Sequence, residues 1–451
     1  MSTGVSAIFC APGFAAYQDA IVTPNRALSW GRLREQVSAE CGNQGELAKQ
    51  RVGLLFQSKV ASYVGLLALG QIGVDLFLMD GRLSSAEALD LGREFNLSAV
   101  LSPGEDGNHL RRQTLESYDA REWSGTSTVT ILTSGSTGRP KAVRHTWTSL
   151  CRPVRSKSST MAPRWLQTYR PNLYAGMQVL LQCLLGHGAL LLPPEGGPPS
   201  SIIEFAAENG VEYISATPSY WRRLLISCDS QLLARMHLRQ ITLGGEVVDQ
   251  SILDTLKQHF PGVRLTHIYA TTELGRCFAV IDGQAGFPAT FLGGPSEDGI
   301  ELNIVDGELF AKSGNAMQCY DGGDSPIRAD SPWFATGDVV EVVGRRVRFV
   351  GRKSEMINVG GNKVYPVEVE SVIRNVPGVC DVRVYGRSSS ISGQLVACEI
   401  VPESGRDATG LKNEVRQACN ASLEAYQLPR LIEFVQQIEL SAAQKTVRSG
   451  R

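Results

Sequence analysis

Short apolar runs separated by helix-length stretches occupy the chain as far as Gly299. The clearest runs are residues 51–57, 128–133, 189–192 and 240–243. Continuous apolar runs of this length are typical of strands buried on both faces, and a helix between two such strands makes them parallel. The alternation predicts an α/β protein with doubly wound layers around mostly parallel sheets.

The two most apolar stretches are residues 64–79 and 173–192. Both contain polar residues, which are Gln71 and Asp75 in the first and Gln178, Gln182 and His187 in the second. A membrane span needs about 20 predominantly apolar residues, so we predict no membrane insertion. Each stretch is predicted to form a buried helix followed by a buried strand.

The spacing of apolar positions changes after Gly299. Strand-like segments now follow one another closely, at residues 300–305, 308–312, 339–342 and 346–350. The connections within the two pairs, 300–305 with 308–312 and 339–342 with 346–350, are too short to hold a helix. They predict a small antiparallel or barrel-like unit at the end of the large domain.

The last hundred residues have a pattern of their own. Strand-like segments at 381–385 and 394–401 and a helical stretch at 410–425 predict a small α+β domain, with residues 388–390 as a loop tip. We place a hinge at residues 351–354. The predicted domains are therefore residues 1–350 and residues 355–451.

Composition narrows the classes of function. The 451 residues are 43% apolar and 20% charged, which is typical of a soluble globular protein. Lys and Arg number 44 against 45 Asp and Glu, so there is no basic footprint and no nucleic-acid partner is predicted. The ten cysteines have no zinc-like spacing, which predicts reduced thiols and no structural metal. No Lys or Arg precedes Arg26, so we expect no secretory signal and a cytoplasmic protein.

A segment rich in glycine and hydroxyl residues follows the predicted strand 128–133. Its residues are Thr133, Ser134, Gly135, Ser136, Thr137, Gly138, Arg139, Pro140 and Lys141. Glycines let a backbone turn around an anion, while hydroxyls and free N–H groups donate to phosphate oxygens. The spacing does not fit G-x-x-x-x-G-K-[ST], which excludes a P-loop ATPase. The segment predicts a phosphate-binding loop, and the alternative is an ordinary Ser/Gly-rich connection.

Further motifs follow this loop in a fixed order. They are Ala216-Thr217-Pro218-Ser219, Gly244-Gly245-Glu246, His267-Ile268-Tyr269-Ala270-Thr271-Thr272-Glu273, Gly307-Glu308-Leu309, Thr336-Gly337-Asp338, Gly351-Arg352-Lys353-Ser354-Glu355, and residues 360–370 beginning Gly360-Gly361-Asn362-Lys363. Together with the loop, they resemble the adenylate-forming superfamily of acyl-CoA synthetases, nonribosomal-peptide adenylation domains and luciferases. The resemblance extends along nearly the whole chain.

The resemblance implies a fold and a reaction. The fold is a large AMP-binding adenylation domain, built of two doubly wound α/β subdomains and a small β-barrel-like unit, followed by a small mobile α+β lid domain. The reaction is activation of a carboxylic acid by ATP, with Mg²⁺, to an acyl-adenylate, and then transfer to a pantetheine thiol. We expect the thiol to be coenzyme A.

The resemblance also implies residue roles in ATP binding. Tyr269 would stack on adenine, Asp338 would accept hydrogen bonds from the ribose hydroxyls, and Arg352 would reach the ribose or phosphates. Thr272 would contact the α-phosphate, and Glu273 would hold the magnesium. The remaining nucleotide-binding residues would be the loop with Lys141, together with Gly245, Glu246, Ala270 and Thr271. For Asp338 the alternative is a turn residue after Gly337.

The catalytic lysine of the superfamily stands in a Thr-x-x-Gly-Lys context, which resembles the segment before Lys445. Here Gln444 takes the place of the glycine. A positive charge is needed where a carboxylate approaches a phosphate, so Lys445, with Thr272 and Glu273, is the predicted catalytic set. The alternative for Lys445 is a solvated tail lysine. His145 is predicted to be structural, because an ionised acid has no proton to lose.

The acid pocket implied by the resemblance involves Tyr174, Gly244 and Ala270. Residues 168–181 contain no Asp or Glu, whereas amino-acid-activating relatives place a counter-ion there. Burying an unpaired ammonium is costly, so we expect an acid without an α-ammonium group. Arg276 could pair with a second carboxylate of the acid or lie at the surface.

Gly360 and Gly361 are predicted to leave room for the pantetheine arm, and the alternative there is a plain turn. The acceptor is either coenzyme A or the phosphopantetheine of an acyl or peptidyl carrier protein. Two other readings stay open: a luciferase-like oxygenase and a non-catalytic nucleotide-binding protein.

Overall fold

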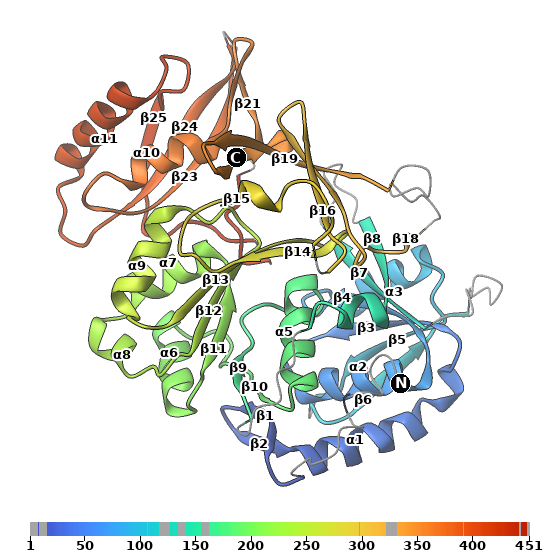
Figure 1. Ribbon diagram of the computed structural model, residues 1–451. Helices are drawn as coiled ribbons and strands as arrows, with labels where there is room; N and C mark the ends of the chain where they lie inside the picture. Colours follow the sequence, from blue (N-terminus) through green and yellow to red (C-terminus); the bar gives the residue numbers. More distant parts are fainter. Residues whose placement is uncertain are drawn as a thin grey trace.

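The structure is a computed structural model that describes residues 8, 16–105, 107–116, 127–133, 141–154, 162–296, 298–321, 332–390, 392–441 and 443–448. Four β-sheets organise these residues (Figure 1). The first two are large and mostly parallel, and helices cover them. The third and fourth are five-stranded and mostly antiparallel.

The first sheet has the strand order β18-β8-β7-β4-β3-β5-β6. Its central strands β7, β4, β3 and β5 are parallel, and their apolar runs are buried. The strands are β3 (Arg51–Phe56), β4 (Asp75–Asp80), β5 (Ala99–Pro103), β6 (Leu110–Thr114), β7 (Thr128–Thr133), β8 (Lys141–Thr146) and β18 (Cys319–Tyr320). The helices nearby in sequence are α1 (Trp30–Asn43), α2 (Val60–Ile72), α3 (Ser85–Glu94) and α4 (Trp147–Cys151), with the short η2 (Gly45–Leu47).

The second sheet has the order β14-β13-β12-β11-β9-β10-β1-β2. Its strands are β1 (Asp19–Thr23), β2 (Arg26–Ser29), β9 (Arg164–Leu166), β10 (Ala189–Leu191), β11 (Tyr213–Ala216), β12 (Gln240–Gly244), β13 (Arg264–Thr271) and β14 (Gly275–Val280). An apolar cluster that includes Trp221, Ile241 and Leu253 joins one face of this sheet to its helices. The helices between the strands of this sheet in the chain are α5 (Tyr174–Leu185), α6 (Pro199–Glu208), α7 (Pro218–Ser227), α8 (Ser230–Ala234) and α9 (Gln250–His259). The helices α6 to α9 contribute to this cluster, whereas α5 packs in the apolar cluster of the first sheet.

The third sheet is the predicted barrel-like unit. Its strands are β15 (Phe287–Pro288), β16 (Glu301–Val305), β17 (Glu308–Lys312), β19 (Phe334–Val343) and β20 (Arg346–Arg352), and η4 (Ala289–Phe291) precedes β16. All of its strand pairs are antiparallel. A small core around Phe287, Leu309 and Val347 fills it.

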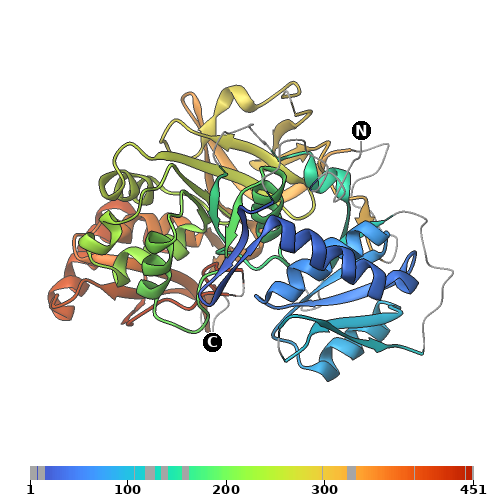
Figure 2. The ribbon, with the colours of Figure 1, turned by 90° about the horizontal axis from the view of Figure 1, so that it is seen from below.

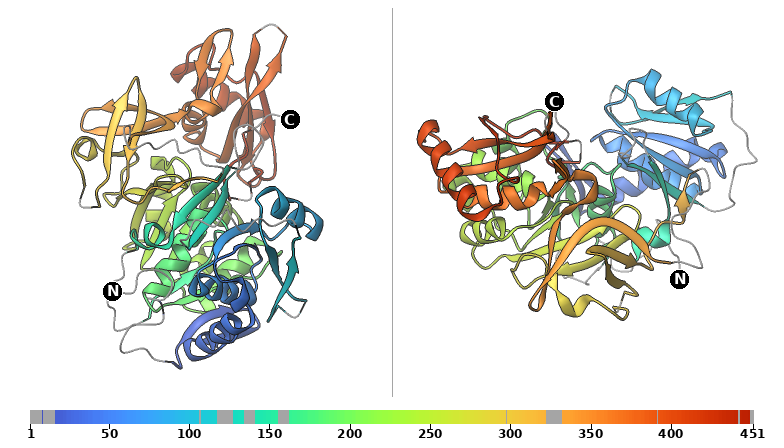
Figure 3. Two further views of the ribbon diagram at one scale, coloured as in Figure 1. Left: turned by 90° about the vertical axis from the view of Figure 1, so that its right-hand side faces the viewer. Right: turned by 90° about the horizontal axis from the view of Figure 1, so that it is seen from above.

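The fourth sheet begins after η5 (Lys353–Glu355). It contains β21 (Ile357–Val359), β22 (Asn362–Val364), β23 (Val379–Ser389), β24 (Gly393–Pro402) and β25 (Leu431–Phe434), with α10 (Pro366–Arg374) and α11 (Ala408–Ser422). Figures 1 and 3 show this part lying over α7 and α9, whereas Figure 2 shows it on the opposite side of the molecule from the first sheet. Its own apolar cluster includes Val369, Val384 and Leu411.

The predicted elements agree with this architecture. Residues 64–79 and 173–192 each form a helix followed by a strand, as expected. Within the described residues, no helix is both long enough and apolar enough to span a bilayer. One prediction was wrong: Ser388 and Ser389 belong to β23, because they pair with Gln394 and Gly393, so the tip of this hairpin begins after them.

Candidate active site

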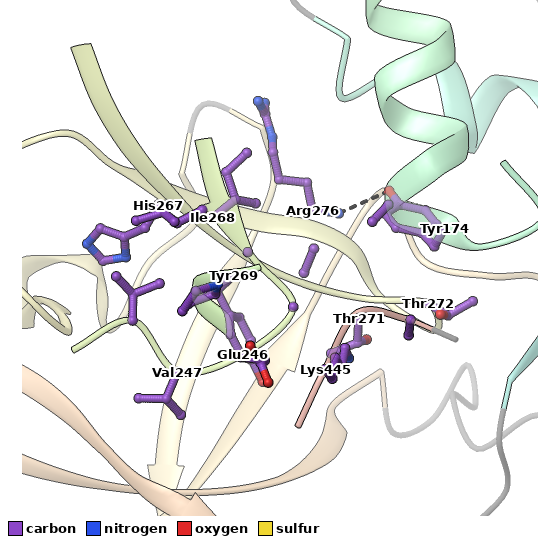
Figure 4. Close-up of a pocket in the computed structure, with 18 of the residues that line it drawn as sticks. Tyr174, Glu246, Val247, His267, Ile268, Tyr269, Thr271, Thr272, Arg276 and Lys445 are labelled. Carbon is purple, nitrogen blue, oxygen red and sulfur yellow. Dashed lines mark hydrogen bonds between the residues drawn. The ribbon is translucent and has the colours of Figure 1, made fainter. Parts of the chain in front are cut away.

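A cavity of about 1130 Å³ lies where the carboxyl ends of β7, β12 and β13 face the third sheet and the C-terminal segment. Parallel strands end at one edge of a sheet, which is where ligands bind in α/β proteins. Predicted residues from between Thr133 and Lys445, which are far apart in the chain, line it: Thr133, Lys141, Tyr174, Gly244, Gly245, Glu246, Tyr269, Ala270, Thr271, Thr272, Glu273, Asp338, Arg352 and Lys445. The fold thus brings most of the predicted site together (Figure 4).

The residues at the two ends of the predicted phosphate loop, Thr133 and Lys141, line this cavity. Ser134, Gly135, Ser136, Thr137 and Gly138 lie outside the described residues, so their role stays a prediction. Thr133 ends β7 and Lys141 begins β8, and the two residues pair across the antiparallel strands. The Lys141 ammonium lies 5.5 Å from the centre of the Tyr320 ring. The two residues that bound the loop therefore lie next to each other on the cavity wall.

The turn after β13 carries Thr272 and Glu273. The backbone N–H of Leu274 donates to the Thr271 hydroxyl at 3.0 Å. The Glu273 carbonyl accepts from the N–H of Met317 at 2.7 Å. Together these contacts fix the backbone of the turn on the cavity wall.

The buried His145 side chain contacts the backbone of the same turn. Its Nε2 lies 2.6 Å from the carbonyl oxygen of Thr272 and its Nδ1 lies 3.1 Å from the Ser149 hydroxyl. Burial lowers the pKa of His145 to about 4, although the hydrogen bond to Thr272 acts in the opposite direction. A neutral imidazole that donates to a backbone carbonyl is structural, in agreement with the sequence-based prediction.

Asp338 is held by two protein donors. The Tyr269 hydroxyl donates to Oδ2 at 2.6 Å, and Arg352 Nε donates to Oδ1 at 2.8 Å. Arg352 is placed there by pairing directly opposite Asp338 between β19 and β20. A carboxylate offers about four lone-pair positions, so each oxygen can still accept one further hydrogen bond. That capacity matches the two hydroxyls of a ribose.

Tyr269 lies among aromatic rings. Its ring stacks on Phe278 and on Phe349, with centroids 5.2 Å apart in both pairs. Burial, followed by the charge of Asp338, raises the pKa of Tyr269 well above its ordinary value, so its hydroxyl stays a donor. The Phe residues and Asp338 together define the plane of this ring. The predicted contact with adenine stays a prediction.

Lys445 enters the cavity from the C-terminal segment. A Cβ added to Gly245 would lie only 3.3 Å from Lys445 Cε, and Gly245 has a φ of +85°. A side chain at this position would therefore crowd the lysine and strain the backbone. Burial, and then the nearby Arg352, lowers the pKa of Lys445. Lys445 is thus not a solvated tail residue in this conformation.

Backbone contacts fasten the segment that carries Lys445. The Glu246 carboxylate accepts from the N–H of Thr446 at 2.7 Å and from the N–H of Ser219 at 3.1 Å. The hydroxyls of Ser219 and Thr446 lie 2.9 Å apart. The Thr217 hydroxyl donates to the carbonyl of Gln444. The motif residues 216–219 and 244–246 therefore bind the C-terminal segment around Lys445, and we call this set of residues the dock.

A buried ion network joins the C-terminal domain to the body of the protein. Asp249 pairs with Arg222 and with Arg374, and Nη1 of Arg374 lies 3.4 Å from Oδ2 of Asp249. Arg374 and Arg448 both pair with Glu370, at 3.0 and 2.9 Å. Burial alone would raise the pKa of Glu370, but the two arginines lower it to about 2. The glutamate therefore stays charged between them.

Gly360 and Gly361 form the exposed turn between β21 and β22, with φ values of +58° and +91°. A Cβ at either position would have no neighbour within 4 Å. Neither glycine belongs to the cavity lining in this conformation. Their role in admitting the thiol stays a prediction.

Tyr174 begins α5 and faces the turn that follows β13. The backbone N–H of Arg276 donates to its hydroxyl at 3.2 Å, and Figure 4 shows the Arg276 side chain pointing away from Lys445. The guanidinium pairs with Asp298 at 3.1 Å. Arg276 therefore has a protein carboxylate as partner, unlike the substrate carboxylate considered from the sequence.

Sequence reasoning missed several residues of the site. Ser219, Tyr320, Arg374 and Arg448 all line the cavity. Ser219 belongs to the motif of residues 216–219, but its sequence did not indicate a role for it. Tyr320 lies in none of the motifs. Arg374 and Arg448 act through pairs that join distant parts of the chain, a relation that no local pattern reveals.

Comparison with known proteins agrees with this arrangement. Residues 15–320 match the family model of the AMP-binding enzymes, and residues 368–445 match that of the AMP-binding enzyme C-terminal domain. The 2-succinylbenzoate–CoA ligase of Listeria monocytogenes is 24% identical over 454 aligned residues, which cover 96% of this chain and 95% of the relative. The indoleacetate–CoA ligase of Aromatoleum aromaticum is 30% identical over 222 residues, 46% of this chain and 43% of the relative.

Solved structures share the fold. The anthranilate CoA ligase AuaEII in complex with anthranoyl-AMP superposes with a TM-score of 0.81 at 18% identity, covering 99% of this chain and 95% of the other. The o-succinylbenzoate CoA synthetase of Bacillus subtilis, in complex with its acyl-adenylate intermediate, has a TM-score of 0.72 at 19% identity, covering 99% and 97%.

Proposed function

Because the chain belongs to the family of AMP-binding enzymes, we propose that it joins an aromatic carboxylic acid to coenzyme A in two steps. In the first step a carboxylate oxygen attacks the α-phosphorus of ATP. The bond to the β-phosphate breaks, and pyrophosphate leaves. In the second step the thiol sulfur attacks the acyl carbon, the bond to AMP breaks, and the thiol proton passes to solvent.

The position of Lys445 is the observation that carries this proposal. Its side chain shares one cavity with Asp338, Thr272 and Glu273, although it comes from the far end of the chain. The first step brings two anions together, and a preorganised cation at that point lowers the barrier. Lys445 supplies this charge in a dock built by Glu246 and Ser219. A nucleotide-binding protein without catalysis has no need of such a dock.

The residues present also fit a magnesium ion that arrives with ATP. Glu273 offers a single carboxylate on the cavity wall, and among the described residues no group of three or more His, Cys, Asp or Glu could hold a metal. Mg²⁺ commonly binds one or two protein carboxylates and completes its shell with water and phosphate oxygens. Bound there, it would neutralise phosphate charge, while Thr272 donates to the α-phosphate.

The cavity wall supports an aromatic acid as substrate. Trp165, Tyr169, Tyr174 and Tyr213 line it, and Trp165 stacks on Tyr213 at 4.7 Å. Flat apolar walls favour a ring, because aromatic pairs contribute beyond their buried area. The relatives named above act on 2-succinylbenzoate and indoleacetate, and a similar fold holds anthranoyl-AMP. We therefore propose a benzoate-like or arylalkanoate acid without an α-ammonium group.

The second step requires a different arrangement of the C-terminal domain. We propose that residues 351–354 are the hinge between a domain of residues 1–350 and a domain of residues 355–451. Rotation there would withdraw Lys445 and bring the turn of Gly360 and Gly361 to the cavity, where the pantetheine arm would pass. We place the reaction in the cytoplasm, which supplies coenzyme A and suits the free cysteines of the described residues.

The test is a pair of half-reaction assays with a panel of aromatic acids. Pyrophosphate exchange reports the first step, and thioester formation from a supplied acyl-adenylate reports the second. Lys445→Ala should lower exchange by about a hundredfold or more and leave thioester formation largely intact. The matched control is Lys257→Ala, which removes an exposed lysine of α9. Exchange at the parental rate in Lys445→Ala would overturn the assignment.

A second arm of the assay distinguishes the acceptors. Coenzyme A is replaced by a phosphopantetheinylated carrier protein at the same concentration. The proposal expects rapid transfer to coenzyme A. Transfer to the carrier alone would identify a loading enzyme and overturn the choice of acceptor while preserving the first step.

A further inference from the structure

A buried cluster of four charges lies beside the active site in the first sheet. Asp321, just after β18, accepts from Arg51 at 2.8 Å and from Arg144. Arg144 also pairs with Asp75 at 3.2 Å. Arg51 and Asp75 are almost fully buried, and Asp321 is 10% exposed. A buried carboxylate between two guanidinium groups has little freedom to move.

This cluster fixes a segment that crosses from the third sheet to the first. The N–H of Asp321 donates to the Ala142 carbonyl at 2.8 Å, and Tyr320 pairs with Val143 on β8. Tyr320 is adjacent to Asp321 in the chain, so its side chain has a defined position on the cavity wall.

Tyr320 contacts two predicted ATP-binding residues from different elements. Its hydroxyl donates to Glu273 Oε1 at 3.3 Å. Its ring lies under the Lys141 ammonium at 5.5 Å from the centroid, within the range of a cation–π contact. The side chain thus lies between the carboxylate assigned to magnesium and the lysine at the end of the phosphate loop.

We propose that Tyr320 is a positioning residue, which orients the Glu273 carboxylate toward the magnesium of MgATP and holds Lys141 on the same side of the cavity. This inference rests on the proposed function. A glutamate side chain has three rotatable bonds, and a donor fixed to the sheet restricts them before the metal arrives. The Asp321 cluster provides the rigidity, and the hydroxyl provides the contact.

Two substitutions separate the hydroxyl from the ring. Tyr320→Phe keeps the contact with Lys141 and removes the hydrogen bond to Glu273. Tyr320→Leu removes both. Tyr17→Phe, at an 84% exposed tyrosine, is the matched control. Thermal unfolding of each variant shows whether the fold is intact.

The measurement is binding of the non-hydrolysable analogue α,β-methylene ATP by calorimetry, with Mg²⁺ and with EDTA. With Mg²⁺, we expect Tyr320→Phe to bind the analogue about tenfold more weakly than the parent, which is typical of removing a residue that orients a metal ligand. With EDTA, we expect its affinity to equal that of the parent. Tyr320→Leu should weaken binding under both conditions. Tyr17→Phe should behave as the parent.

Two results would overturn the inference. One is that Tyr320→Phe binds the analogue as tightly as the parent does with Mg²⁺. The other is that the substitution lowers the affinity for the analogue equally with Mg²⁺ and with EDTA. Because binding needs no turnover, these results are distinct from failure of the proposed function. That failure would appear as a parental protein that binds the analogue but activates no acid. A parent that gains no affinity from Mg²⁺ would overturn the metal role of Glu273 and this inference together.

Discussion

At the scale of single residues, Gln444 departs from the pattern of the superfamily and has an unusual backbone. Its φ is +60°, the left-handed region in which glycine is favoured. A left-handed conformation costs a side-chain-bearing residue about 1–2 kcal/mol. The Thr217 hydroxyl donates to the Gln444 carbonyl, so the contact that docks this residue does not depend on its side chain. The position requires the conformation of a glycine, and Gln444 adopts it under strain.

Gln444→Gly is therefore predicted to favour the docked segment by up to about 1 kcal/mol, after the greater entropy of unfolded glycine is subtracted. Pyrophosphate exchange should stay equal or rise severalfold. Gln444→Val is the opposed variant, because a β-branched residue is poorly tolerated at positive φ, and exchange should fall. Equal rates in the three proteins would show that strain at this residue does not limit docking.

His145 gives a second prediction at this scale, on pH. Its pKa is about 4 in the fold against an ordinary 6.5, so between these values the unfolded chain binds more protons. Stability contributed by the neutral form is therefore lost as pH falls through this window. From pH 7 to pH 5 the loss from this group should be about 2 kcal/mol.

Urea unfolding at the two pH values checks this prediction. His145→Gln removes the titrating ring and keeps an N–H donor that can reach the Thr272 carbonyl. The variant should lose about 2 kcal/mol less than the parent on acidification. An identical pH dependence would mean that other groups determine the acid sensitivity.

At the scale of elements, apolar periodicity alone predicted most strands and the change to antiparallel pairing after Gly299. Local pattern failed where pairing decides the boundary. The loop tip predicted at residues 388–390 is an example, because Ser388 and Ser389 extend β23 by pairing with Gln394 and Gly393 of β24. Motif order predicted many of the cavity residues: the motifs around Thr217, Gly245 and Thr272 follow or end β11, β12 and β13, whereas Asp338 lies inside β19. Tyr320 and Arg374 depend on contacts across sheets and could not be predicted.

The β21–β22 hairpin gives a prediction for the second half-reaction. Gly360→Leu should spare pyrophosphate exchange, because the turn is exposed and outside the cavity in this conformation. Thioester formation should fall by at least tenfold if the turn later faces the pantetheine arm, since a leucine side chain would fill that path. The matched control is Gly344→Leu in the β19–β20 turn, where φ is +61° and a Cβ also has no neighbour.

Both substitutions place a side chain at positive φ and should cost a similar 1–2 kcal/mol or so of stability. Only Gly360→Leu should separate the half-reactions. Parallel loss of both half-reactions in the two variants would support a plain turn.

At the scale of the whole molecule, ion pairs and polar hydrogen bonds are among the contacts that join the two domains. Asp249 of the body contacts Arg374 of the C-terminal domain, and Glu246 accepts from the backbone of Thr446. Interfaces of this polar kind are typical of domains that move against each other. The lid movement proposed above would dock this domain for one step and release it for the next, which requires contacts that can be exchanged for water.

Asp249→Asn tests this balance directly. The asparagine can still cap α9, where Asp249 accepts from the N–H of Ile252 at 3.1 Å, but it no longer neutralises Arg374. The docked arrangement should lose about 1.5 kcal/mol, which corresponds to about a tenfold decrease in pyrophosphate exchange, while thioester formation from supplied adenylate should stay equal or rise. Asp229→Asn is the matched control, because Asp229 caps α8 in the same manner, with Oδ1 accepting from the N–H of Leu232 at 2.7 Å. Equal losses in both half-reactions would instead make Asp249 a residue of general stability, and the ion network would have no part in choosing between the two arrangements.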